Sequence, residues 1–205
     1  MKLFRITCSL IVLLLSLVAF AFVAVHPAAA QQALNPPPPP FLTCKAVGNG
    51  TICQGSRIVS YGPDDLGIVC GSDSSAFAVE DSGTFTQSAI RYYDQDGNLT
   101  RRVIHEDYSF GQLSNELTGK AVPYTEHDTF TDVLAVPGDF SSATETTTGE
   151  VIVRPAQGAP VYADVGRTVV APDGTIEFSA GRQDSNAYFY FGDTSVAQKL
   201  CAALS

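Results

Sequence analysis

Histidine and basic residues are scarce in this chain, and their scarcity argues against several functions. The 205 residues include three His and 12 Lys or Arg, against 21 Asp or Glu, which gives a formal net charge of −9 at pH 7. A surface with this acidic excess repels nucleic acid and anionic lipid. We therefore expect no nucleic-acid partner, and we interpret the charge first as a solubility feature.

Catalytic sequence motifs are also missing. The chain has no G-x-S-x-G nucleophile turn, no S-x-x-K pair and no histidine-rich metalloprotease motif. The segment 117–120, Leu-Thr-Gly-Lys, lacks the first glycine of a phosphate-binding loop. The sequence therefore predicts no catalytic residue and no cofactor. Among three hypotheses for the function of the protein, an enzyme of unspecified chemistry ranks third.

Helical periodicity is absent from most of the chain, and short strand-like runs take its place. Turn residues separate the runs at Pro63-Asp64-Asp65, Pro137-Gly138-Asp139 and Gln157-Gly158. This pattern predicts an all-β fold, either an antiparallel barrel or a β-sandwich. The expected strands lie near residues 56–61, 67–70, 76–80, 84–94, 98–110, 129–136, 142–148, 150–154, 161–170 and 175–180.

One short helix is expected at the C-terminal end of the sequence. Asp193 is a favourable N-cap for a helix over residues 194–204, and Val196, Leu200 and Ala203 share one face of it. An apolar face on a short helix indicates that the helix docks against the sheet or plugs one end of a barrel.

The strongest local signal predicts a hairpin around Asp96-Gly97, and Asp173-Gly174 predicts a second hairpin of the same kind. A three-residue loop over 95–97 places Tyr93 opposite Leu99 and Arg91 opposite Arg101. In this register, one face carries Ala89, Arg91, Tyr93, Leu99, Arg101, Val103 and His105. The other face carries Ile90, Tyr92, Thr100, Arg102, Ile104, Glu106 and Tyr108. Neither face is cleanly apolar or cleanly polar, which favours a barrel whose lumen holds polar groups.

The same hairpin supplies the candidate binding residues. Guanidinium groups are well suited to carboxylates and other anions, and aromatic side chains beside them would complete a pocket. We therefore predict a site for a small anionic or amphipathic ligand, formed by Tyr92, Tyr93, Arg91, Arg101, Arg102 and His105. Pairing of these arginines with nearby carboxylates is the alternative interpretation.

Two clusters of His and acidic residues, 105–107 and 126–128, invite a metal-site interpretation. Neighbouring residues on a strand point to opposite faces, so each cluster offers only alternate side chains to one site. We therefore predict polar or paired surface residues here and no metal.

The first thirty residues have the pattern of a secretory signal peptide. Lys2 and Arg5 precede an apolar run over residues 6–25, and Ala28-Ala29-Ala30 supplies a small-residue cleavage site before Gln31. The expected result is a secreted protein with no stable membrane insertion. The alternative is an uncleaved N-terminal anchor with the domain outside, because the run is long enough to span a bilayer.

Removal of residues 1–30 leaves 175 residues, enough for one domain, with 21 acidic and 10 basic side chains and a net charge of −11. Residues 36–40 are all proline, so residues 31–43 are interpreted as an extended linker before a single domain over residues 44–205.

Four cysteines remain after processing, and an even number in an exported chain predicts two disulfides. Three pairings are possible. The favoured one joins Cys44 to Cys53 across a turn at residues 48–50, and therefore Cys70 to Cys201.

Several segments together resemble a group of small exported proteins from actinobacteria and related bacteria. They are RYYDQDGNLTRRVIHE (91–106), NELTGKAVPYT (115–125), TDVLAVPGDF (131–140), GRTVVAPDGTIEFSAGRQ (166–183) and CAAL (201–204). The resemblance implies an exported all-β domain and no assigned activity. The first functional hypothesis is therefore a secreted ligand-binding module, and the second is a cell-envelope structural or interaction protein with an unknown protein partner.

Overall fold

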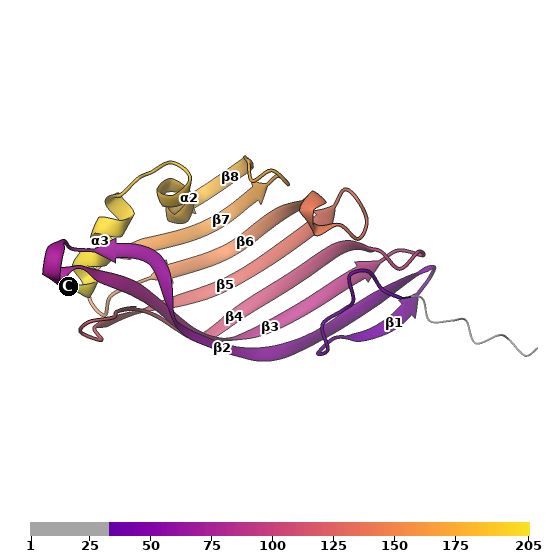
Figure 1. The fold of residues 1–205 in the computed structure, drawn as a ribbon, viewed down its shortest axis with the longest axis horizontal. Helices are drawn as coiled ribbons and strands as arrows, with labels where there is room; N and C mark the ends of the chain where they lie inside the picture. Colours follow the sequence, from indigo (N-terminus) through magenta and orange to yellow (C-terminus); the bar gives the residue numbers. More distant parts are fainter. Residues whose placement is uncertain (1–32) are drawn as a thin grey trace, which may run out of the picture. The chain divides into compact units, whose positions relative to one another are not determined.

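A single antiparallel sheet of eight strands makes up the domain (Figure 1). The computed structural model describes residues 33–205, so the predicted signal peptide and its cleavage site lie outside the described residues. Each strand pairs with the next one along the chain: β1 (Thr43–Val47), β2 (Gly50–Cys70), β3 (Phe77–Tyr93), β4 (Leu99–Asn115), β5 (Ala121–Leu134), β6 (Ala143–Val153), β7 (Tyr162–Val170) and β8 (Ile176–Gln183). The all-β antiparallel prediction is confirmed. Over residues 33–205 the two edge strands, β1 and β8, are not paired with each other, so the sheet is open.

Several strands are longer than the sequence pattern indicated. The expected runs 56–61 and 67–70 are parts of β2, and 142–148 and 150–154 are parts of β6. The predicted turn at Pro63-Asp64-Asp65 is wrong, because the chain continues there as β2 with register shifts between Tyr61 and Asp64 and between Asp65 and Val69. A bulge tolerates proline because the hydrogen-bond ladder is already interrupted. The other two predicted turns lie between strands, as expected.

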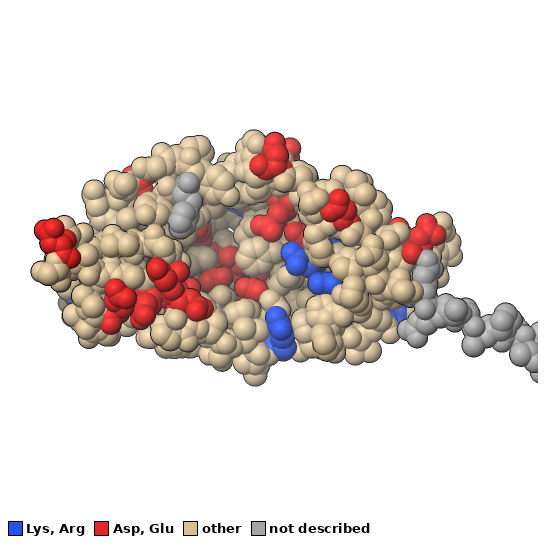
Figure 2. Space-filling model, viewed as in Figure 1, with Lys and Arg blue, Asp and Glu red and all other residues tan. Residues whose placement is uncertain are grey.

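A row of three glycines crosses β6, β7 and β8. Gly149 lies opposite Gly166, which lies opposite Gly181. A Cβ atom at Gly166 would stand 2.1 Å from the Ala180 carbonyl oxygen, and one at Gly181 would stand 2.0 Å from the Val165 oxygen. Only glycine permits so close an approach of two strands with these left-handed φ values. The row therefore permits the sheet to curve (Figure 1), and the concave face of the sheet borders the hollow that the space-filling view shows (Figure 2).

Two helices follow the last strand: α2 (Asp184–Phe189) and α3 (Ser195–Leu204). The prediction of the C-terminal helix is confirmed, and Val196 and Leu200 are buried as expected, with Leu204 in place of Ala203 as the third buried residue. The predicted N-cap is wrong by one residue, because the N-cap is Thr194; Asp193 precedes it and accepts a hydrogen bond from the Ser195 amide at 2.9 Å. The helix α2 was not predicted. Contacts of α3 with β2, β5 and β7 place it across the mouth of the curved sheet. There it packs on a core that includes Val79, Leu113 and Val153.

Both disulfides have the pairing that the sequence favoured, Cys44–Cys53 and Cys70–Cys201. The first joins opposite residues of β1 and β2, and the second ties α3 to the end of β2. Two disulfides indicate an oxidising compartment. In the part of the chain that the structure describes, no helix has the length and apolar character needed to cross a membrane.

The proline-rich segment lies on the domain, which corrects the linker prediction for residues 34–43. Asn35 exchanges backbone hydrogen bonds with the hairpin: its amide donates to the Gly97 oxygen at 2.8 Å, and the Leu99 amide donates to its oxygen at 2.8 Å. Leu34, Phe41 and Leu42 pack in a second core cluster with Leu99. Polyproline has no internal hydrogen bonds, so its exposed carbonyl groups are free to accept from the domain.

Candidate functional site

The register of the central hairpin decides which predicted residues share a face. Tyr93 lies opposite Leu99, as predicted, but a register shift follows, and Tyr92 pairs with Arg101 and Arg91 with Arg102. The predicted pairing of Arg91 with Arg101 is therefore wrong. Thr100 is the extra residue on β4, and its hydroxyl donates to the Tyr92 carbonyl oxygen at 3.1 Å.

The six predicted binding residues are divided between the two faces. Arg91 and Arg102 line a cavity on the concave face. Arg101 is exposed on the other face, with its guanidinium 5.7 Å from the centre of the Tyr92 ring. His105 is exposed and hydrogen-bonds the Thr129 hydroxyl at 2.8 Å. Tyr93 is buried, and its hydroxyl donates to the Pro36 carbonyl oxygen at 3.0 Å.

Both histidine clusters present their histidines to solvent on the outer face of the sheet. His127 pairs with Asp107 on the neighbouring strand, with 2.7 Å between Nδ1 and Oδ1, and both side chains are exposed. Over residues 33–205, no group of three or more His, Cys, Asp or Glu side chains is arranged to hold a metal ion.

Carboxylic acids gather inside the hollow, where Figure 2 shows acidic side chains in its depth and basic ones to their right. Glu126 and Asp128 are alternate residues of β5, and Glu106 lies opposite Asp128 on β4. Burial, reinforced by the charges of Asp128 and Glu106, raises the pKa of Glu126 to about 8. Burial and the neighbouring Asp164 raise the pKa of Asp128 to about 6. At neutral pH, Glu126 is therefore mostly protonated and Asp128 mostly ionised.

Glu126 also stands out by its lack of protein partners. Within the described residues its carboxyl group makes no hydrogen bond and no ion pair, whereas Glu106 accepts a hydrogen bond from Gln87 at 2.8 Å. A half-buried carboxylic acid without a protein partner remains available to hydrogen-bond a bound molecule.

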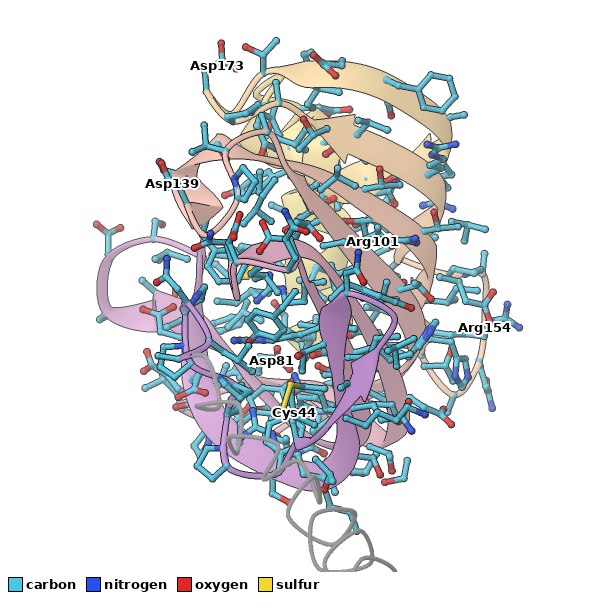
Figure 3. The ribbon with its side chains drawn as sticks, turned by 90° about the vertical axis from the view of Figure 1, so that its right-hand side faces the viewer. Cys44, Asp81, Arg101, Asp139, Arg154 and Asp173 are labelled. Carbon is cyan, nitrogen blue, oxygen red and sulfur yellow. A yellow bond between two sulfur atoms is a disulfide. The ribbon has the colours of Figure 1, made fainter. Side chains whose placement is uncertain are left out.

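A cluster of hydrogen-bonded oxygens lies beside Glu126 in the hollow. The Tyr61 hydroxyl donates to Asp81 Oδ2 and the Tyr124 hydroxyl donates to Asp81 Oδ1, each at 3.0 Å, and the two hydroxyls are 2.5 Å from each other. Figure 3 shows Asp81 within the space that the curved sheet encloses. Burial raises the pKa of Asp81 and of both tyrosines.

An apolar cavity of about 180 Å³ connects these polar groups to the helix α3. Its apolar lining comes from both the sheet and the helix: Leu66, Ile68, Leu113, Val151, Val153, Val196 and Leu200. Its polar lining consists of Asp81, Tyr124, Glu126, Tyr162 and Tyr188. An apolar chamber with a few convergent polar groups is the usual form of a small-molecule site.

The sequence analysis interpreted Glu126 only as part of the polar cluster 126–128, and it missed Asp81 and Tyr124. A signal for Glu126 and Tyr124 was present in β5, where Val122, Tyr124, Glu126 and Asp128 occupy alternate positions. Alternation predicts that these side chains share a face. It does not say that the shared face lines a hollow, because that depends on the curvature of distant strands.

Comparisons with known proteins identify no relative of this chain. No protein-family model matches it, and neither a curated protein nor a solved structure does. We therefore infer the function from the geometry of the hollow.

Proposed function

We propose that this protein binds a small amphipathic molecule in the apolar cavity between the sheet and α3. The observation that carries the proposal is Glu126, a half-buried carboxylic acid without a protein partner at the polar end of an apolar chamber. The apolar body of the ligand would contact Leu113, Val153 and Leu200. Its polar head would hydrogen-bond Glu126.

The charge of the hollow restricts the head group. Asp81, Glu106, Asp128 and Asp164 all contribute negative potential that helps raise the pKa of Glu126. An anionic head in this cavity would be repelled by the same charges. The ligand of this cavity therefore carries an uncharged acceptor, such as a ketone, or a cationic amine.

Isothermal titration calorimetry with 2-octanone, octylamine and octanoate tests the proposal, because the three probes have similar chains and different heads. We expect 2-octanone to bind below pH 8, where Glu126 donates a hydrogen bond, and to weaken above it. Octylamine should behave in the opposite way. Octanoate should not bind in this cavity, so any octanoate binding elsewhere on the protein should be unaffected when this cavity is filled. Equal binding of all three probes at every pH would show that Glu126 does not select the head.

Two variants complete this test. Val151→Phe fills the cavity beside Glu126 and should abolish binding of both active probes. Val165→Phe, at an exposed position on β7, is the matched control and should bind them as the wild type does. If no probe binds to the wild-type protein, the cell-envelope structural or interaction role becomes the better account.

We further propose that the protein is secreted, because its two disulfides require an oxidising compartment and residues 1–30 have the pattern of a signal peptide. Mass spectrometry of protein from the culture medium tests this. A chain that begins at Gln31 and lacks four hydrogens for two disulfides is expected. A chain retained in the membrane fraction would favour the anchored alternative.

Acid–base catalysis is a second candidate function, and the pKa values of Glu126 and Asp128 favour it. One carboxyl group is mostly protonated and the other mostly ionised at neutral pH, the division of roles that proton-transfer enzymes use. Deprotonation of 5-nitrobenzisoxazole provides a test that needs no known substrate. A rate that rises through pH 6 and is lost in Asp128→Asn would support catalysis. A rate no greater than that of free acetate would count against it.

A further inference from the structure

We propose a second binding site, for a small carboxylate with an apolar body, in a cavity beneath the proline-rich segment. The cavity has a volume of about 230 Å³ and lies among Arg57 of β2, Arg91 of β3 and Arg102 of β4. Pro39, Phe41, Gln87, Ala89 and Ile104 complete its lining. No residue that lines this cavity also lines the apolar cavity at α3, so each proposed site can be tested independently of the other.

The three guanidinium groups retain most of their hydrogen-bond donors. Arg57 Nε donates to the Gln87 side-chain oxygen at 3.0 Å, Arg91 Nη1 to the Pro37 carbonyl oxygen at 3.2 Å, and Arg102 Nε to Asp132 at 2.6 Å. A guanidinium group carries five N–H donors in a planar fork. Each arginine therefore keeps donors without an acceptor among residues 33–205, and such forks match the two oxygens of a carboxylate.

The positive charge of the cavity also favours the binding of an anion. Arg91 and Arg102 lie directly opposite each other on β3 and β4, an arrangement that destabilises a sheet unless negative charge intervenes. Asp132 is the one carboxylate that forms an ion pair with any of the three arginines within the described chain. Glu106, the nearby acid on β4, accepts its hydrogen bond from Gln87. A bound carboxylate would relieve the remaining repulsion.

Aromatic rings hold the guanidinium groups in place. Arg57 lies 4.7 Å from the centre of the Phe41 ring, and Arg102 lies 4.9 Å from that of Phe140. Stacking occupies the face of a guanidinium group and leaves its N–H edge free. The apolar rim formed by Pro39, Phe41 and Ile104 favours an anion with an apolar body over an inorganic one.

Calorimetry of the whole protein with sodium benzoate tests this site, with benzamide as the uncharged analogue and inorganic phosphate as the alternative anion. We expect saturable binding of one benzoate and no binding of benzamide. Arg57→Gln and Arg91→Gln should each weaken benzoate binding at least tenfold. Arg102 is left intact because its removal would leave buried Asp132 without its partner.

The matched control is Arg101→Gln, which removes an exposed arginine next to Arg102 but on the opposite face. It should change benzoate binding by less than twofold, and so should Val151→Phe, which fills the other cavity. Equal binding of benzamide, tighter binding of phosphate, or an equal loss in Arg101→Gln would overturn the proposal. Loss of benzoate binding in Val151→Phe would place benzoate in the cavity at α3 and would also overturn it.

Discussion

The substitution Glu126→Gln tests the electrostatics of the hollow through the pH dependence of stability. The pKa of Glu126 is raised from its ordinary value of 4.5 to about 8 by burial and neighbouring acids. Between these two values, the folded protein holds a proton that the unfolded chain releases. Stability must therefore fall as the pH rises from 4.5 to 8, and the full loss is present above pH 8.

The size of this loss of stability follows from the shift in the pKa of Glu126. One pKa unit corresponds to about 1.4 kcal/mol, so the full shift would amount to roughly 5 kcal/mol. Glu126 lies at a cavity that water can enter, and we expect solvent screening to reduce this to about 2–3 kcal/mol. Glutamine resembles the protonated acid in shape and does not ionise. The variant should therefore match the wild type near pH 4.5 and become more stable than it by about 2–3 kcal/mol at pH 9.

Urea denaturation of both proteins from pH 4.5 to pH 9, with the disulfides intact, measures this difference. Glu177→Gln on β8 is the control, because Glu177 is exposed, and its stability curve should run parallel to that of the wild type. A stability difference between Glu126→Gln and the wild type that stays constant across this range would contradict a raised pKa for Glu126. It would mean that the carboxyl group ionises as freely in the folded protein as in the unfolded chain.

Three further predictions concern the frame around the hollow. The Cys70–Cys201 disulfide closes a separation of 131 residues, so replacing its two cysteines by serine should cost about 5 kcal/mol. The Cys44–Cys53 disulfide closes a separation of 9 residues, so replacing its two cysteines by serine should cost about 3 kcal/mol. Equal shifts of the urea midpoint for the two variants would contradict this prediction. Gly166→Ala brings a Cβ to 2.1 Å from a carbonyl oxygen, while Gly174→Ala has no atom within 4 Å, although both glycines have positive φ. Gly166→Ala should therefore be less stable by at least about 2 kcal/mol in thermal denaturation, and similar values would show that strand contact does not matter. Asp132→Asn weakens the ion pair with Arg102, in which the acid is 4% exposed, and should lower the free energy of unfolding by about 2–3 kcal/mol. Asp96→Asn in the exposed hairpin loop should lower it much less. A small loss of stability in both variants would show that the ion pair contributes little.

Local signals were sufficient to predict much of the fold. The turn at residues 48–50 brings Cys44 and Cys53 together, the Asp-Gly loop places Tyr93 opposite Leu99, and the apolar face of α3 is visible in its sequence. Each of these features depends on residues that are close in the sequence. Turn geometry and periodicity, which can be read from neighbouring residues, are enough to predict them.

Features that depend on distant segments could not be predicted in the same way. The extra residue at Thr100 changes which arginines share a face, and sequence alternation does not reveal a bulge. The proline-rich segment reads as a linker because polyproline has no preferred partner, yet it packs on the hairpin through Asn35 and Leu34. The inward position of Glu126 depends on sheet curvature, to which glycines on three other strands contribute.

Glu126 is, in our proposal, a half-buried acid that faces the bound ligand. Carboxyl ¹³C NMR of glutamate-labelled protein tests this proposal most directly, with Glu126→Gln to assign the resonance and 2-octanone as the probe. We expect a titration midpoint near pH 8 for the free protein and a higher midpoint with 2-octanone, because the ketone accepts a hydrogen bond only from the protonated acid. A midpoint near 4.5 that does not move when 2-octanone is added would contradict the proposal.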